Sequence, residues 1–284
     1  MAATVIALVG WGNWSSAKAA TAQPVALKPV NIENAGPARV DLLDSRFCPS
    51  DLEVAIASII NNARFDSARW GISIESLSDQ TALYRHNSDT SLIPASNIKL
   101  LTTAAALQIV SDRSPQDLFN LESWITVVNR DSHNAYADDL LRRVGGQHAV
   151  QQALTPLGID PNSYEQVDGS GLSRQNRATP TAFVTLLKSM HAHSERDLFY
   201  RSLPVAGVSG TLRNRFRATS IQGRLHAKTG TLRGVRALSG YLETPNYGTV
   251  ALSILINQSG QSGQVMLGAI DQIVQQTARV APCD

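Results

Sequence analysis

The chain has 284 residues, of which 43% are hydrophobic and 17% are charged, and its formal net charge is +2 at pH 7. This length allows one large domain or two small ones. The near-neutral charge gives no electrostatic support for a nucleic-acid partner, and the absence of an 18-residue apolar run after the N-terminus argues against a stable membrane span.

The first residues resemble an export signal. The apolar segment 4–14 is followed by two serines and the sequence AKA, a small-x-small pattern suited to signal peptidase, although no positively charged region precedes it. A frayed tail is the alternative. We predict an exported, periplasmic or otherwise extracytoplasmic protein with a signal peptide at 1–19, an extended arm or linker at 20–47, and a folded domain at 48–284.

Hydrophobic periodicity then predicts a succession of helices and strands. The first helix follows Ser50, a plausible cap, with Glu53 three residues on. Next come a strand, its hairpin partner, four helices, three strands and a closing helix, over 69–77, 81–87, 94–107, 132–146, 146–158, 179–193, 223–234, 235–244, 247–257 and 263–278. This order favours an α/β (α+β) domain: an antiparallel sheet flanked by terminal helices, with an inserted helical section.

The two cysteines bracket this domain. Cys48 opens the folded region and Cys283 nearly ends the chain. In an exported protein such a pair is suited to a disulfide that ties the first and last elements together, whereas two unrelated free thiols are the alternative. We predict an intramolecular Cys48–Cys283 disulfide, conditional on export.

A serine and a lysine stand three residues apart where the apolar helix after Pro94 begins. Ser96 and Lys99 of PASNIKLLTTAAAL share one helix face. A cation in the first turn opposes the helix dipole, and apolar neighbours make its charge costly. A lysine that loses its proton for these reasons is a suitable base for a serine nucleophile. A helix cap with a surface lysine is the alternative.

Two further motifs carry polar groups that a catalytic site would use. Ser132 and Asn134, in NRDSHNAYADDLL, stand at a helix entry, where capping is the default interpretation. Lys228 lies in HAKTGTL, a strand whose lysine would ordinarily face solvent at a sheet edge. Alternatively, Ser132 relays a proton, Asn134 binds an amide, and the exposed edge binds a peptide with the help of three residues, Thr229, Gly230 and Thr231.

The order Ser-x-x-Lys, Ser-x-Asn, Lys-Thr-Gly is a signature set of penicillin-binding proteins and serine β-lactamases. Over most of residues 48–284 the chain resembles the D-alanyl-D-alanine carboxypeptidase/endopeptidase family, the low-molecular-mass penicillin-binding proteins of the peptidase S13 type. The resemblance rests on PASNIKLLTTAAAL, VDGSGLSRQNRATP, LPVAGVSGTLRNRF and KTGTLRGVRALSGY.

This resemblance implies a β-lactamase/penicillin-binding-protein transpeptidase-like fold. It also implies that Ser96 attacks the D-Ala-D-Ala bond of a peptidoglycan stem peptide, with Lys99 as general base and an acyl-enzyme intermediate, and that β-lactams inhibit covalently. The Thr231 and Ser96 N–H groups would form an oxyanion hole. No metal or other cofactor is implied. The sequence departs from the family in the spacing of Ser96 and Ser132, only 36 residues, where relatives carry a long insertion.

Two other functions remain open at this point. A β-lactamase needs a group that activates the deacylating water, and Glu165 and Asp168 are available, although EQVDGSG is typical of an S13-type turn. A non-catalytic peptidoglycan- or partner-binding protein of the same fold is the second, and the intact Ser96, Lys99 and Lys228 argue against it.

Several other polar or aromatic residues have simpler explanations. His191, His193 and Glu195 look like metal ligands, but i, i+2 spacing directs the two imidazoles apart, which favours a solvated helix end. His226 alternates with Lys228, so either it faces the cleft or it has a packing or surface role. A solvated face is expected for Arg213, Arg215 and Arg217, and a core position for Tyr200 and Tyr241.

Overall fold

The computed structural model describes residues 47–110 and 115–283. The predicted signal peptide and residues 20–46 of the predicted arm lie outside these ranges. Within them, no helix has the length and apolar character needed to cross a membrane.

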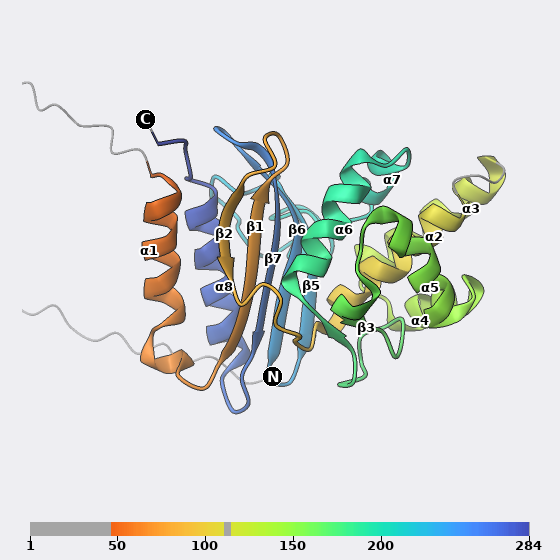
Figure 1. Ribbon diagram of the computed structural model, residues 1–284, viewed down its shortest axis with the longest axis horizontal. Helices are drawn as coiled ribbons and strands as arrows, with labels where there is room; N and C mark the ends of the chain where they lie inside the picture. Colours follow the sequence, from red (N-terminus) through yellow and green to blue (C-terminus); the bar gives the residue numbers. More distant parts are fainter. Residues whose placement is uncertain (1–46, 111–114, 284) are drawn as a thin grey trace, which may run out of the picture. The chain divides into compact units, whose positions relative to one another are not determined.

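Five antiparallel strands form the central sheet, in the order β2-β1-β7-β6-β5 (Figure 1). The strands are β1 (Arg69–Ser76), β2 (Ala82–His86), β5 (Leu225–Leu232), β6 (Val235–Thr244) and β7 (Gly248–Asn257). A two-residue turn joins β5 to β6, so that Leu232 at the end of β5 pairs with Val235 at the start of β6. Because β5 is at one end of the order, one of its edges pairs with no other strand of this sheet.

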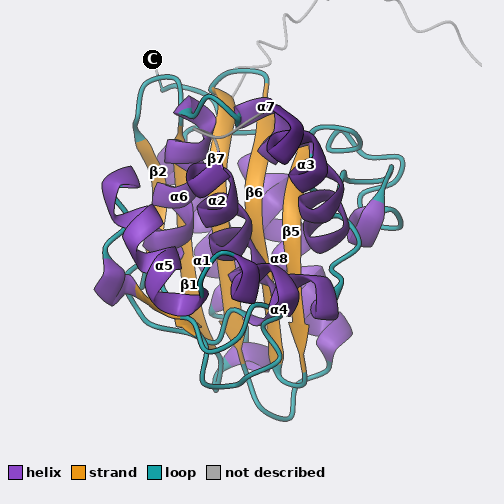
Figure 2. Ribbon diagram, turned by 90° about the vertical axis from the view of Figure 1, so that its right-hand side faces the viewer, coloured by secondary structure: helices purple, strands orange, loops and turns teal. Residues whose placement is uncertain are grey.

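Helices cover both faces of the sheet, as Figure 1 shows. The first and last helices pack together on one face: α1 (Pro49–Ile60) and α8 (Gly263–Thr277). Seen from the other side, the remaining helices lie in front of the strands (Figure 2). They are α2 (Lys99–Val110), α3 (Pro115–Asn129), α4 (Asn134–Arg143), α5 (Gly146–Leu154), α6 (Pro180–Ala192) and α7 (Arg196–Arg201).

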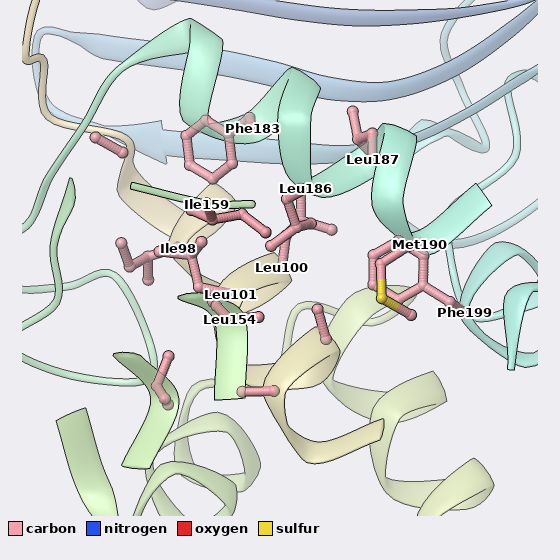
Figure 3. Packing of buried hydrophobic residues seen from close by; sticks show 14 of the residues in the cluster. Ile98, Leu100, Leu101, Leu154, Ile159, Phe183, Leu186, Leu187, Met190 and Phe199 are labelled. Atoms are coloured by element: carbon pink, nitrogen blue, oxygen red, sulfur yellow. The ribbon is translucent and has the colours of Figure 1, made fainter. Parts of the chain in front are cut away.

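The two faces of the strands supply two separate hydrophobic cores, because side chains alternate across a sheet. One core joins α1 and α8 to the sheet, with Ile72 and Ile254 among its members. The other joins the remaining helices, where Leu100 and Leu101 of α2 pack near Phe183 of α6 (Figure 3). Helix α2, which begins at the predicted base Lys99, is therefore surrounded by apolar side chains.

The predicted architecture is confirmed: an antiparallel sheet is flanked by the terminal helices, and a helical section is inserted between β2 and β5. Helices α3 and α7 were not predicted, nor was a two-stranded ribbon of β3 (Tyr164–Glu165) and β4 (Arg177–Ala178). These elements are short or mixed in composition, and packing rather than periodicity fixes them.

The predicted cap of the first helix is wrong. Helix α1 begins at Pro49, so Ser50 lies inside it and Cys48 is the N-cap. The Cys48 N–H donates to Asp51 Oδ2 at 3.0 Å, which is the reciprocal contact of a capping box. Proline at the first helical position has no N–H to lose, and this explains why the helix starts there.

The predicted disulfide is present between Cys48 and Cys283, which are 235 residues apart in sequence. The Ala281 N–H also donates to the Phe47 carbonyl at 2.8 Å, so the two ends of the described domain are joined by the backbone as well. A cross-link that closes so long a loop removes much of the conformational freedom of the unfolded chain.

We expect the double variant Cys48→Ser/Cys283→Ser to lower the free energy of unfolding by about 2–5 kcal/mol, as for other native disulfides. Urea denaturation followed by circular dichroism measures the change. The wild-type protein treated with a reductant is the control and should unfold like the variant. Equal midpoints for variant and oxidised wild type would contradict a stabilising role.

Candidate active site

Ser96 lies in a tight turn that leads directly into a buried helix. Residues Ala95–Ile98 form the short 3-10 helix η2, and α2 follows from Lys99. Ala95, which precedes the serine, has a φ of 49°, a strained value for a residue other than glycine. Strain of this kind concentrates at functional sites, where the surrounding structure holds it.

Lys99 is completely buried, and its ammonium group contacts the predicted nucleophile. Its Nζ donates to Ser96 Oγ and to Asn134 Oδ1, both at 2.9 Å, and also to the Ser170 carbonyl oxygen. Ser96 Oγ in turn donates to the same carbonyl at 3.2 Å. The first two sequence motifs therefore meet at a single nitrogen atom.

Burial lowers the pKa of Lys99 to about 8, because the protein interior solvates an ammonium group poorly. The carboxylates of Asp138 and Asp168 oppose this effect through their negative charge. A lysine with a pKa near 8 is neutral in a useful fraction of molecules at neutral pH, and it can then accept a proton.

The second lysine connects the third motif to the second. Lys228 of β5 is completely buried, and its Nζ donates to Ser132 Oγ at 2.8 Å and to the Thr229 carbonyl at 3.1 Å. Burial and the neighbouring charge of Lys99 hold the pKa of Lys228 well below its usual value. Ser132 itself has a φ of 57°, a second strained backbone at this site.

The capping alternative for Ser132 and Asn134 is wrong. His133 is the N-cap of α4, and its Nδ1 accepts from the Tyr136 N–H at 3.4 Å. The neighbouring side chains contact the two lysines instead: Asn134 contacts Lys99, and Ser132 contacts Lys228. The short spacing between Ser96 and Ser132 therefore does not keep the motifs apart, since α2 and α3 return the chain to the site.

A buried polar side chain fixes the nucleophile turn against the sheet. Asn97 Nδ2 donates to Ser239 Oγ at 2.7 Å, and Ser239 Oγ bonds Ser253 Oγ at 2.8 Å. A Cβ atom on Gly230 would lie 2.6 Å from the Pro94 carbonyl oxygen. The absence of a side chain at Gly230 thus allows the turn that carries Ser96 to approach the strand closely.

A loop after β3 supplies the carbonyl that both Ser96 and Lys99 contact. Asp168 holds this loop: its carboxylate accepts from the N–H groups of Gly171 at 2.6 Å and Ser173 at 2.7 Å, and from Asn176 Nδ2 at 2.8 Å. Gly171 has a φ of 82°, and a Cβ there would collide with the Ala95 carbonyl. The sequence VDGSGLSRQNRATP contains this loop, but no pattern in it indicates the contact with Ser96.

The free edge of β5 is open beside Ser96. In the β5–β6 register, Leu232 faces Val235 across the turn, so Thr229 and Thr231 occupy positions whose backbone N–H and C=O groups point away from β6. Further along the same edge, the Ala227 N–H donates to the Pro204 carbonyl at 3.0 Å. The edge is thus covered at Ala227 and accessible at the two threonines.

A cleft of about 420 Å³ lies beside Ser96 and the open edge of β5. It is lined by Ser96, Ser132, Asn134, Leu172, Thr211, Arg215, Thr229, Thr231, Arg236 and Leu267. The two lysines lie buried behind it. The solvated position predicted for Arg215 is wrong, because this side chain is only 10% exposed and pairs with Asp271.

The remaining polar candidates lie elsewhere. His226 stacks on Tyr200, with ring centroids 4.1 Å apart, and does not line the cleft. Tyr241 is buried, as predicted. Both nitrogens of His193 are engaged, since Nδ1 accepts from the Glu195 N–H and Nε2 bonds Gln108 Oε1. In the part of the chain that the structure describes, no group of three or more metal-binding side chains is close enough to hold an ion.

Comparison with protein families identifies the chain. The model of the D-Ala-D-Ala carboxypeptidase 3 (S13) family matches residues 52–114 and 118–280, which is most of the chain. The chain belongs to this family. All three motifs of the site lie within the matched residues.

Individual relatives of this S13 chain match over shorter stretches. A D-alanyl-D-alanine carboxypeptidase of Actinomadura is 39% identical over 166 residues, which are 53% of this chain and 30% of the relative. A penicillin-sensitive carboxypeptidase A of Dictyostelium discoideum is 35% identical over 162 residues, 50% of this chain and 31% of the relative. The matches thus span about a third of these relatives' own length.

Solved structures share the fold of this S13 domain. Penicillin binding protein 4 of Haemophilus influenzae, complexed with a β-lactam, has a TM-score of 0.67 at 14% identity, over 82% of this chain and 99% of that one. A β-lactamase from Chitinophaga pinensis also has a TM-score of 0.67, at 18% identity, over 80% of this chain and 98% of that one. The predicted penicillin-binding fold is confirmed.

If neutral Lys99 activates Ser96, the rate of Ser96 acylation by a β-lactam should rise with pH. We expect an increase of about tenfold per pH unit below a midpoint near 8 and a plateau above it, because deprotonation creates the active base. Stopped-flow acylation with benzylpenicillin measures the profile. Lys99→Met, the control, should be about 10²–10⁴-fold slower. A rate that is flat or falls with rising pH would contradict this role.

Removing the Asp168 carboxylate should slow acylation about tenfold to a hundredfold, since the loop that holds the Ser170 carbonyl loses three hydrogen bonds. Mass spectrometry of Asp168→Ala over time separates acylation from deacylation. The exposed Glu165→Ala is the matched control and should be unchanged. Normal acylation with blocked deacylation would instead make Asp168 the base that a β-lactamase requires.

Proposed function

We propose that this protein is a serine-type D-Ala-D-Ala carboxypeptidase that acts on peptidoglycan stem peptides. The observation that carries the proposal is the 2.9 Å contact between Ser96 Oγ and the buried Lys99 Nζ, in a cleft beside an open strand edge. Membership in the S13 family supports the same activity.

Substrate binding uses the free edge of β5. A peptide lies antiparallel to Thr229–Thr231 and exchanges main-chain hydrogen bonds with the outward-facing groups of this segment. Asn134 Oδ1 accepts from Lys99, which leaves its Nδ2 to donate to an amide carbonyl of the substrate. The hydroxyls of Thr229 and Thr231, with the Lys228 charge behind them, receive the terminal carboxylate.

Acylation begins when neutral Lys99 takes the Ser96 proton and Oγ attacks the carbonyl carbon of the penultimate D-alanine. The backbone N–H groups of Ser96 and Thr231 stabilise the oxyanion that forms. The C–N bond then breaks, and Ser132, whose Oγ accepts from Lys228 Nζ at 2.8 Å, relays a proton from Lys99 to the departing amine. Free D-alanine leaves, and an ester remains on Ser96.

Deacylation transfers the peptide to water. Lys99, neutral again after giving up its proton through Ser132, activates a water molecule that attacks the ester carbonyl, and the Ser96 oxygen recovers a proton. A β-lactam follows the first half of this sequence: its ring opens onto Ser96 Oγ, and the bulky remainder stays tethered in the cleft, which slows hydrolysis.

The β-lactamase alternative is weaker on this geometry. Both oxygens of Asp168 hold the N–H groups of its own loop, and Glu165 is exposed on β3. A non-catalytic role is weaker still. Burial of the Lys99 ammonium costs free energy, and a protein that only binds a partner gains nothing from that cost. We also propose export to an extracytoplasmic compartment, which the Cys48–Cys283 disulfide supports.

Incubation with benzylpenicillin followed by peptide mass spectrometry tests the proposal. We expect one covalent adduct on the peptide that contains Ser96, none in Ser96→Ala, and release of D-alanine from a peptide ending in D-Ala-D-Ala by the wild type alone. A folded wild-type protein without an adduct would reject the assignment. Rapid, sustained hydrolysis of nitrocefin would favour a β-lactamase instead.

A further inference from the structure

A row of flat side chains crosses the surface of α3 and α4, which pack against each other on the side of the helical section away from the sheet (Figure 1). The rings of His133 and Tyr136 meet edge-on with centroids 4.8 Å apart, and the Trp124 ring lies 4.8 Å from that of Tyr136. The Arg143 guanidinium lies over the Trp124 ring, 4.8 Å from its centroid. We call these four side chains, joined by contacts in this order, the aromatic row.

Packing between the two helices does not account for the aromatic row. Tyr136 is 40% exposed, and it is the one exposed phenylalanine, tyrosine or tryptophan among the residues whose side chains the structure describes. His133 and Arg143 are exposed as well, and Trp124 is half-buried. A group of large rings that water can reach is typical of a surface that binds a ligand.

The aromatic row begins at the catalytic cleft. His133 lies between Ser132 and Asn134, both of which line the cleft. Tyr136 and Arg143 are two helical turns apart and therefore share one face of α4. The rise of a helix places Arg143 about 14 Å further along the axis than Asn134. A molecule that enters the cleft and also contacts the whole row is therefore an extended chain.

The far end of the aromatic row reaches a groove of about 260 Å³ between α2, α3 and α4. Trp124 and Arg143 line this groove, and the rest of its lining is aliphatic apart from Asn120. The match to the family model is interrupted between residues 114 and 118, close to the groove in sequence. The surface thus lies beside the point at which this chain and the family model diverge.

Stacked rings with hydrogen-bonding groups beside them are suited to a chain of sugars. A pyranose ring presents C–H groups on its faces, which pack on aromatic rings, and hydroxyl or acetamido groups at its edges. His133 Nδ1 accepts from the Tyr136 N–H, so the neutral imidazole carries its hydrogen on Nε2 as a donor. Arg143 Nε donates to Asp139 Oδ2 at 2.6 Å, and both of its Nη atoms carry further N–H donors.

From these observations we infer that the aromatic row binds the glycan strand of the peptidoglycan whose stem peptide enters the cleft. The inference rests on the proposed function for the identity of the polymer, and it makes the polymer, rather than a free stem peptide, the preferred substrate. The sugars stack on Tyr136 and Trp124, and the apolar groove receives an acetamido methyl group. A bound strand holds its stem peptides near Ser96 and so raises their effective concentration.

Calorimetric titration of Ser96→Ala with peptide-free glycan strands, obtained by amidase treatment of peptidoglycan, tests the row without a catalytic step. We expect binding, and about tenfold weaker binding when Tyr136→Ala is added, because stacking on the ring is lost. Tyr136→Phe retains the ring and should bind like the parent. Unchanged affinity in folded Tyr136→Ala, or no binding by the parent, would overturn the inference.

Arg143→Gln tests the far end of the row with an exposed residue whose loss does not threaten the fold. We expect it to weaken glycan binding about threefold to tenfold. Arg142→Gln is the matched control: Arg142 is exposed and also pairs with Asp139, at 2.7 Å, but the structure places Arg143 over the Trp124 ring. The control should bind normally. Equal losses in the two variants would reduce the effect to general charge and overturn the role of the row.

Kinetics on polymer and peptide give a second readout. Release of D-alanine from soluble, uncross-linked peptidoglycan strands should exceed release from the free stem peptide about tenfold in kcat/KM, mainly through KM, because the extra contacts form before the reaction. Tyr136→Ala should bring this ratio close to one. Thermal unfolding checks that each variant is folded. A ratio that folded Tyr136→Ala leaves unchanged would contradict the inference.

The aromatic row and the proposed function fail separately. Glycan binding that depends on Tyr136 supports the row even if Ser96 forms no adduct with benzylpenicillin. A Ser96 adduct without glycan binding would reject the row and leave the proposed function intact. Sedimentation velocity tests the other occupant: a wild-type dimer that Tyr136→Ala converts to a monomer would assign this surface to a second copy of the chain and overturn the inference.

Discussion

Burial of the Lys99 ammonium is the constraint on which the rest of this structure depends. An unpaired cation inside an apolar core is expensive, and here its contacts are a hydroxyl, an amide oxygen and a carbonyl oxygen in place of a carboxylate. Asp138 and Asp168 influence it only through their charge. The arrangement lowers the stability of the protonated form, and that cost makes the neutral amine available as a base.

The fold meets this constraint by bringing three separate segments to one point. Helix α2 presents Lys99 from the apolar side, the loop before α4 brings Ser132 and Asn134, and β5 brings Lys228 from the sheet. The contact between Asn97 and Ser239 fixes the nucleophile turn to the strand, and Gly230 allows that turn to approach closely. Sheet and helical section thus act as rigid supports on either side of a short strained turn.

Sequence reasoning named the residues that the structure brings together at the cleft, because their types and order are distinctive. It also recovered the five strands of the central sheet and most of the helices, whose apolar residues follow regular periods, but it missed α3, which is as long as α8. It did not find the contacts made by backbone atoms, such as the Ser170 carbonyl, or the loop role of Asp168, because these depend on how a turn folds back in space. Arg215 was misjudged for a related reason: its partner Asp271 lies 56 residues away, on α8.

The site also explains why a single motif is weak evidence. Ser132 and Asn134 flank a genuine helix cap, so their local sequence fits capping as well as catalysis. Only the distances to Lys228 and Lys99 distinguish the two interpretations. In the same way, Lys228 would be an ordinary edge lysine if its side chain reached solvent, yet it is fully buried.

The central claim is that residue 99 is a neutral amine in a substantial fraction of molecules near neutral pH. The most direct measurement is an NMR titration of protein labelled with ¹³C at the lysine Cε atoms, with the resonance of residue 99 assigned by its absence in Lys99→Met. The account predicts that this resonance titrates with a midpoint near 8. A midpoint at the ordinary lysine value of about 10.4 would contradict it.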